Sequence, residues 1–363
     1  MIAFLNAFSH FLVDWTCVSA VFASGAFGTE LFYVILVYDT LAFSTQCVVG
    51  LLLDSLRAGR GAHAESFYGL AASCGMGMTA FGAGLLSSMS LLGMQSGLLR
   101  MICICVIGLG NSLFHVSGGI VTYKQSSGKA APLGVFVAPG AFGVTLGTLF
   151  PQYSWLAAAA LAVACVSGLT VYTRLRSAKG REKQSGKSDD AVYGTKTDTA
   201  KPFPTLCVVL LTAAVAVRAI GGSAVSFPWK TGAYMALLLT LFVFLGKSLG
   251  GFVCDRTGAS KMAAVTIPVA AVLTAFFSDS MAASLAGQFL INLSMPVTLW
   301  LLHRMLPKEP GLAFGLAASA LWPGTAAGLL IELTGPARQF LIIISFVFGT
   351  FAIIYAEHYR RKS

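Results

Sequence analysis

Charged residues are scarce in this chain, and long polar segments are nearly absent. Asp, Glu, Lys and Arg make up only 10% of the 363 residues, whereas soluble domains carry about 25%. This shortage excludes an ordinary water-soluble enzyme or binding module, because such proteins need a charged surface. The sequence also contains no Gly-x-x-x-x-Gly-Lys-Ser/Thr loop, so we do not expect direct use of ATP.

Apolar runs fill the chain instead, and 56% of the residues are hydrophobic. A run of about 20 apolar residues is long enough to cross a membrane core of about 30 Å as a helix. The sequence therefore predicts an all-α membrane protein with twelve transmembrane helices. The runs lie near residues 3–24, 30–54, 66–89, 96–123, 131–150, 154–173, 204–227, 232–254, 261–280, 282–302, 311–333 and 338–356.

Basic residues indicate how the chain is oriented. Lys and Arg gather in every second connection between the runs, beginning with Arg57 and Arg60, and are rare in the other connections. By the positive-inside rule both termini should be cytoplasmic, and we expect an integral protein of a bacterial inner membrane. Anionic lipid head groups explain the net charge of +10, so the lipid bilayer is an expected partner and nucleic acid is not. The first run lacks a basic leader, so we interpret it as a retained helix.

Cysteine and histidine give no sign of a cofactor. All eight cysteines fall inside apolar runs, which argues against a disulfide framework. No two histidines are spaced as His-x-x-x-His, a spacing that often binds zinc on a helix. We therefore predict neither a metal nor another cofactor. His10, Asp14 and His115 are too scattered in the sequence to predict a catalytic site.

One long polar stretch divides the chain into two related halves. Residues 174–203 are rich in Ser, Gly, Thr and charge, which is typical of a flexible cytoplasmic linker. The linker separates a predicted six-helix bundle at residues 1–173 from another at residues 204–363. Both halves contain a Gly-x-x-x-Asp motif at the end of an apolar run, and each copy is followed by a short basic turn. Internal repetition of this kind is typical of secondary transporters.

The second copy of this motif resembles the Gly-x-x-x-Asp-Arg-x-Gly-Arg-Arg signature of the major facilitator superfamily, with Asp255, Arg256 and Gly258 in place. The first copy is looser, since Ser55 stands where the family has Arg. The resemblance covers essentially the whole chain and implies two pseudo-symmetric six-helix bundles that rock around a central site. An Arg-x-x-Gln-Gly pattern marks proton-driven members of the family, and here Ile104 stands at the Arg position.

The acids of the two motifs predict a gate. Each acid lies at the cytoplasmic end of a helix and faces the negative pole of that helix's dipole, so a basic residue or the N-terminus of a neighbouring helix must compensate it. The resemblance implies that these acids hold the halves together in the outward-facing state and release them on switching; a static ion pair is the alternative. The predicted gating residues are Gly50, Asp54, Arg57, Arg60, Gly251, Asp255 and Arg256.

Ionisable residues inside the apolar runs are the candidates for substrate binding, because such residues are costly in a membrane and generally face a cavity or a partner. Arg218 and Lys247 would attract a carboxylate or phosphate strongly. The alternative is a structural ion pair of these cations with Asp14 or Asp39. Asp14 aligns with Arg218 between the halves, and could pair with it in the empty site. The residues predicted to bind substrate are Arg218, Lys247, Asp14, Trp15, Trp322, Asn111 and Asn292, and those predicted to carry coupling are His115, Asp14 and Asp39.

Together these features favour a secondary active transporter that moves a small organic solute, anionic or zwitterionic, by alternating access. We expect a monomer whose partners are the small-molecule substrate, the bilayer and a coupling proton or cation. The alternative within the same fold is a proton-coupled exporter of drugs or other amphipathic compounds. An alternative from a different class is a membrane-embedded enzyme.

Overall fold

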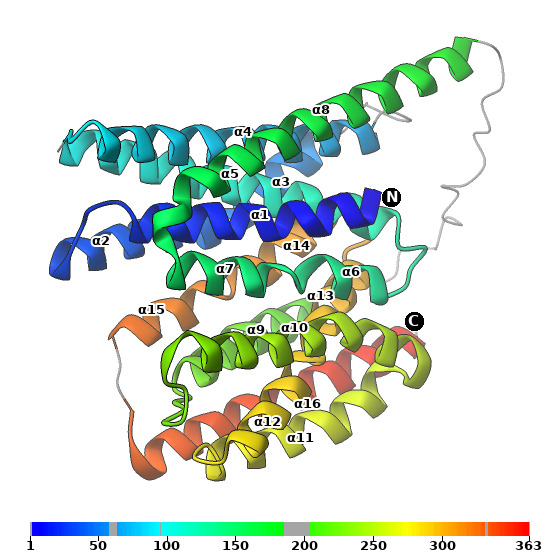
Figure 1. Cartoon of the computed structure of the whole chain (residues 1–363). Coiled ribbons are helices and arrows are strands. Elements are labelled where there is room, and N and C mark those ends of the chain that lie inside the picture. Colours follow the sequence, from blue (N-terminus) through cyan, green and yellow to red (C-terminus); the bar gives the residue numbers. More distant parts are fainter. Residues whose placement is uncertain (1, 58–63, 95, 185–203, 331–332, 363) are drawn as a thin grey trace.

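A computed structural model describes residues 2–57, 64–94, 96–184, 204–330 and 333–362 (Figure 1). All regular structure in these ranges is helical. In chain order the elements are α1 (Ile2–Phe22), α2 (Gly28–Asp39), the π-helix η1 (Thr40–Ser44), α3 (Gln46–Arg57), α4 (Ala64–Leu91), α5 (Gly97–Lys124), α6 (Ala131–Val137), α7 (Gly140–Leu149), the 3-10 helix η3 (Pro151–Tyr153), α8 (Ser154–Gln184), α9 (Thr205–Ser223), α10 (Gly232–Thr257), α11 (Ala259–Phe276), α12 (Met281–Asn292), α13 (Ser294–Met305), α14 (Pro310–Ser319), α15 (Trp322–Leu330) and α16 (Gly335–Lys362).

The helices confirm the predicted all-α membrane fold. Within the described residues, eleven helical segments are long and apolar enough to cross a membrane. The remaining segment, α1, has 21 residues but carries Asn6, His10 and Asp14 along its length, which lowers its hydropathy. Helices suit this environment because every backbone N–H and C=O can be satisfied within the segment, away from water.

Four of the predicted spans are each built from two α-helices rather than one. The π-helix η1 separates α2 from α3, Ala138 and Pro139 separate α6 from α7, Leu293 separates α12 from α13, and Ala320 and Leu321 separate α14 from α15. Proline contributes to three of these breaks, because it lacks the N–H that would continue the helical bonding of the preceding turn. Interrupted helices of this kind line the binding sites of many transporters.

Helix α8 extends further than the apolar pattern predicts. The apolar run ends near residue 173, yet the helix continues to Gln184. The first part of the predicted linker at residues 174–203 is therefore helical, and residues 185–203 lie outside the described residues. Polar residues can continue a helix beyond the membrane, where no apolar pattern marks its end.

The two halves of the chain pack as separate groups of helices that meet along one face. In the first half α4 packs on α5 and α8, and α1 packs on α7; in the second half α16 packs on α9 and α11. The halves meet where α3 packs on α14 and where α10 packs on α6. Figure 1 shows both chain termini at the same end of the bundle, which we call the terminal end. The starts of α6 and α14 and the ends of α3 and α10 lie at this end.

Candidate functional site

The carboxylate of Asp54 joins the two halves at the terminal end. Asp54 lies on the last turn of α3, and its oxygens accept hydrogen bonds from the backbone N–H groups of Gly311, at 3.0 Å, and Leu312, at 2.9 Å. These N–H groups belong to the first turn of α14, where helical residues have no partner inside their own helix. The positive pole of the α14 dipole therefore compensates this acid.

Asp255 makes the equivalent contact in the opposite direction. It lies near the end of α10 and accepts hydrogen bonds from the N–H groups of Ala130, at 2.8 Å, and Ala131, at 3.0 Å, at the start of α6. Of the two compensating groups allowed by the sequence, a basic residue or a helix N-terminus, the structure contains the second at both motifs. Two acids thus attach the halves by pseudo-symmetric contacts.

Glycine lets the helices approach closely enough for these contacts. A side chain at Gly50 would overlap the backbone carbonyl of Gly311, and one at Gly251 would lie 2.5 Å from the carbonyl oxygen of Ala130. Both separations are shorter than van der Waals contact, so no larger residue fits while the halves touch. Both motif glycines therefore lie at the crossing points of helices from opposite halves.

The basic residues of the predicted gate contribute less. Arg57 approaches the backbone oxygen of Lys308 at 3.5 Å, which is a weak contact from a half-buried residue. Arg256 is exposed. Arg60 lies outside the described residues. The contacts described here are therefore made by the acids and glycines of the motif.

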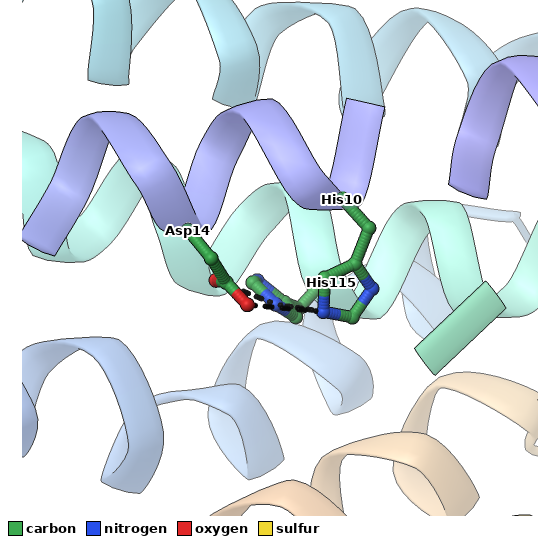
Figure 2. A group of neighbouring side chains, drawn as sticks. All are labelled: His10, Asp14 and His115. Carbon is green, nitrogen blue, oxygen red and sulfur yellow. Dashed lines mark hydrogen bonds and ion pairs between the residues drawn. The ribbon is translucent and has the colours of Figure 1, made fainter. Parts of the chain in front are cut away.

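Three ionisable side chains converge inside the first half (Figure 2). Asp14 and His10 lie one turn apart on α1, with 3.3 Å between His10 Nε2 and Asp14 Oδ2. His115 on α5 places its Nε2 atom 3.4 Å from Asp14 Oδ1 and 3.0 Å from His10 Nε2. We call His10, Asp14 and His115 the His–Asp–His cluster. The side chains are between 7% and 14% exposed, so the cluster lies almost entirely within the protein.

The sequence predicted two members of this cluster and missed the third. Asp14 and His115 stand out as ionisable residues inside apolar runs, whereas the separation of the three residues in the chain does not predict that His10 joins them. The available signal was the His-x-x-x-Asp spacing from His10 to Asp14, since residues four apart lie on the same face of a helix. What the spacing does not reveal is that α5 packs on α1 at this level.

Gly140 makes room for the cluster. It is the first residue of α7, directly after the break at Pro139. A side chain at Gly140 would overlap Asp14 Oδ2 and would lie 2.5 Å from His10 Nε2. Because the helix is interrupted here and Gly140 has no side chain, the start of α7 can approach the carboxylate of Asp14. The positive end of the α7 dipole then stabilises the negative charge of that carboxylate.

Arg218 is held by neutral groups of the second half. Its Nη1 atom donates to the hydroxyl oxygen of Ser294 at 2.8 Å and, more weakly, to that of Thr298 at 3.5 Å. Its Nη2 atom approaches the sulfur of Met295 at 3.1 Å. The expected pairing of Asp14 with Arg218 is not formed, because Asp14 pairs with the two histidines of its own half instead.

Lys247 lies within electrostatic range of Asp14 and Arg218. The charge of its ammonium group also acts on His10. Arg218 and Lys247 are both partly exposed although they lie within apolar helices. Among the residues that the structure describes, no carboxylate lies within salt-bridge distance of either cation.

The other residues predicted to bind substrate contact neighbouring groups of the protein in this structure. Asn111 donates to the hydroxyl oxygen of Tyr38 at 3.2 Å, and Asn292 donates to a backbone oxygen one turn earlier in its own helix, at 2.8 Å. Trp322 donates to Thr40 Oγ1 across the two halves at 3.1 Å. Trp15 packs on Phe11, with ring centroids 5.7 Å apart. Asp39, at the end of α2, is not a member of the His–Asp–His cluster.

Comparison with known proteins bears on the fold. No protein-family model matches the chain, and no curated protein matches its sequence. The chain is similar in structure to a Major Facilitator Superfamily (MFS) transporter, FucP, in the outward conformation, with a TM-score of 0.58 and 13% identity over 99% of this chain and 98% of that one. It is also similar to the E. coli fucose:proton symporter FucP, with a TM-score of 0.66 and 11% identity over 98% of each chain. The chain therefore has the fold of the major facilitator superfamily, which confirms at the level of fold the resemblance carried by its Gly-x-x-x-Asp motifs.

Proposed function

We propose that this protein is a secondary active transporter that moves a small organic anion or zwitterion across the membrane by alternating access. The fold supports transport, because both similar structures are described as transporters. The identity of the solute cannot be carried over from these structures, since only 11–13% of the residues are identical. The proposal for the solute therefore rests on the charges of this chain.

The observation that carries the proposal is an uncompensated positive charge inside the bundle. Arg218 and Lys247 are cations within apolar helices, and Asp14 is the carboxylate that interacts with Lys247. Among the residues that the structure describes, the hydrogen-bond partners of Arg218 are neutral: two hydroxyl groups and a thioether. A charge left unpaired in a membrane interior is costly. An anionic group of a solute would supply the missing counter-charge, and Arg can bind it through two parallel hydrogen bonds.

The gate contacts support alternating access. Asp54 and Asp255 attach the halves at the terminal end through backbone hydrogen bonds that would be lost if the halves separated there. With both termini in the cytoplasm, as the positive-inside rule predicts, this structure has its cytoplasmic end closed. Transport then requires that these contacts break and that equivalent contacts form at the opposite end. A monomer contains both halves and is sufficient for this cycle.

The prediction that Asp14 and His115 hold a coupling cation remains part of the proposal. One of the similar structures is described as a proton symporter. In this chain the two residues lie next to each other, and Asp14 also interacts with the predicted solute residue Lys247. Solute and cation sites so close together would influence each other directly. Asp39 is retained as a prediction without a contact that supports it.

A ligand screen with matched variants tests the solute class. Purified protein would be heated with small carboxylates, phosphates, amino acids, sugars, nucleosides and hydrophobic cations, and its unfolding temperature recorded. We expect anionic or zwitterionic compounds to stabilise the wild type, and Arg218→Gln and Lys247→Gln to lose this effect. Loss of one hydrogen-bonded charge pair of about 1.5–3 kcal/mol weakens binding roughly ten- to a hundredfold.

The control for this screen is Lys230→Gln, because Lys230 is an exposed lysine in the connection before α10. This variant should respond to ligands as the wild type does. Stabilisation by neutral sugars alone, unchanged in Arg218→Gln, would contradict an anionic solute. Stabilisation by hydrophobic cations would favour the amphipath exporter.

A further inference from the structure

We propose that His10, Asp14 and His115 form a binding site for a divalent transition-metal ion of the Zn²⁺ type. The histidines lack a metal-binding spacing in the chain, so the sequence alone does not predict a metal. The site arises only when α5 packs against α1. The proposal concerns equilibrium binding of the ion and does not depend on the proposed transport function.

The donor atoms converge at separations that suit one ion. Two imidazole nitrogens and the carboxylate oxygens lie 3.0 Å, 3.3 Å and 3.4 Å apart across the three pairs. Zinc binds His nitrogen at about 2.0–2.1 Å and carboxylate oxygen at about 2.0–2.2 Å, so neighbouring ligands of a tetrahedral ion lie about 3.3–3.4 Å apart. Movements of a few tenths of an ångström would bring all three residues onto a single ion.

The hydrogen bond of His115 supports this arrangement. Its Nδ1 atom lies 2.9 Å from the backbone oxygen of Asn111, which has no proton to donate. Nδ1 therefore carries the proton, and a neutral imidazole then directs the lone pair of Nε2 toward Asp14 and His10. Histidines that bind metals are commonly oriented in this way, with the second ring nitrogen donating to a carbonyl or carboxylate.

His10 takes part in the cluster through Nε2, which faces Asp14 and His115. Among the described residues its other ring nitrogen, Nδ1, is buried without a hydrogen-bond partner, so the ring is not oriented by an outer hydrogen bond. The ring is held by aromatic packing, 4.7 Å from the Phe136 ring and nearly perpendicular to it. Gly140 leaves space beside both His10 Nε2 and Asp14 Oδ2. The three residues supply three ligands, so a water or a solute oxygen would complete a tetrahedral site.

Ligand type and local charge limit which ion binds. Two imidazoles and one carboxylate favour Zn²⁺, Co²⁺, Ni²⁺ or Cu²⁺ over Mg²⁺ and Ca²⁺, which prefer oxygen ligands. The ammonium of Lys247 acts on both His10 and Asp14 and opposes a bound cation. Lys247 should therefore weaken the metal site, although it strengthens the proposed anion site.

Co²⁺ binding tests the site directly, because tetrahedral Co²⁺ absorbs visible light much more strongly than hydrated Co²⁺. Full-length protein, freed of any affinity tag, would be titrated with Co²⁺ in detergent, and Zn²⁺ would then be added to displace it. We expect one Co²⁺ per chain with tetrahedral absorption. His10→Gln, Asp14→Asn and His115→Gln should each weaken binding by more than about 100-fold, since loss of an outer hydrogen bond alone costs about 10- to 100-fold.

Two further variants separate this proposal from the proposed function. His358→Gln replaces an exposed histidine at the terminal end and should leave Co²⁺ binding unchanged. Lys247→Gln should tighten Co²⁺ binding while it abolishes stabilisation by organic anions. Asp14→Asn has nearly the same shape as the wild type, and a thermal unfolding measurement would verify that it is folded. If the wild type binds Co²⁺ no better than this variant, the cluster is only hydrogen-bonded and the metal site is refuted. That result would leave the anion proposal intact.

Discussion

Asp14 illustrates how one residue depends on the shape of its neighbours. Its carboxylate faces two histidines and the start of α7, and the space on the α7 side exists because residue 140 is glycine. Gly143, one turn later, faces the α1 backbone, where a side chain would lie 2.5 Å from the carbonyl oxygen of Phe11. Small residues at these positions allow close helix packing in a membrane.

Replacing Gly140 with alanine tests this packing. The added methyl group would overlap Asp14 Oδ2 and crowd His10, and overpacking of this kind costs about 1–3 kcal/mol. We expect a lower unfolding temperature for Gly140→Ala and weaker Co²⁺ binding. Gly84→Ala is the matched control, since a side chain at Gly84 meets nothing within 4 Å. Equal unfolding temperatures of the two variants would contradict the packing described for Gly140.

Burial energetics explains which site residues the sequence could predict. Asp14, His115, Arg218 and Lys247 stand out because ionisable residues are rare inside apolar runs. His10 was missed because its role depends on a partner from another helix. The neutral partners of Arg218, such as Ser294, could not be predicted either. Serine is common in membrane helices, and no sequence pattern distinguishes a serine that binds an arginine.

At the scale of elements, the ends of helices hold the two halves together. The end of α3 meets the start of α14, and the end of α10 meets the start of α6, with one acid at each junction. The repeated motif predicts a compensating group beside each acid, because an acid at the negative end of a helix is otherwise unfavourable. It did not decide between a basic side chain and a helix N-terminus.

Removing either acid should loosen the terminal end. Asp54→Asn and Asp255→Asn keep the shape but remove the charge, which is worth about 0.3–1 kcal/mol at a helix terminus and up to about 2 kcal/mol in partly buried sites. Ala130 is 0% exposed, so a cysteine at this position in an otherwise cysteine-free chain becomes accessible to a thiol reagent only when the halves separate at the terminal end. We expect maleimide to label Ala130→Cys roughly two- to thirtyfold faster in the Asp variants. Unchanged labelling would contradict a gate at these residues, and Asp279→Asn, at an exposed turn, is the control.

The breaks within helices were less predictable than the helices themselves. Apolar runs located the helical segments, eleven of which are long and apolar enough to cross a membrane within the described residues. Pro139, Pro296 and Pro323 lie at or just after three of the breaks, whereas the π-helix at residues 40–44 has no such marker. Proline interrupts a helix locally, but a π-helix depends on packing between neighbouring helices, which a pattern within one segment does not record.

At the scale of the whole molecule, two similar halves carry different charges. The gate acids Asp54 and Asp255 are repeated, while Asp14 in one half corresponds to Arg218 in the other. Repetition fits a symmetric movement of two bundles, and under our proposals the difference in charge places a cation site in the first half and an anion site in the second. The sequence alignment predicted this difference, and the structure adds that each side has its own set of partners.

Uptake into sealed vesicles tests the central claim that Arg218 and Lys247 bind an anionic solute during transport. The measurement is the exchange of a labelled organic anion, chosen as the compound that most stabilises the wild type, across vesicles that contain purified protein. We predict saturable exchange by the wild type and by Lys230→Gln, and rates lower by about ten- to a hundredfold in Arg218→Gln and Lys247→Gln. Equal exchange by all four proteins, or chemical conversion of the compound in detergent without vesicles, would contradict the account.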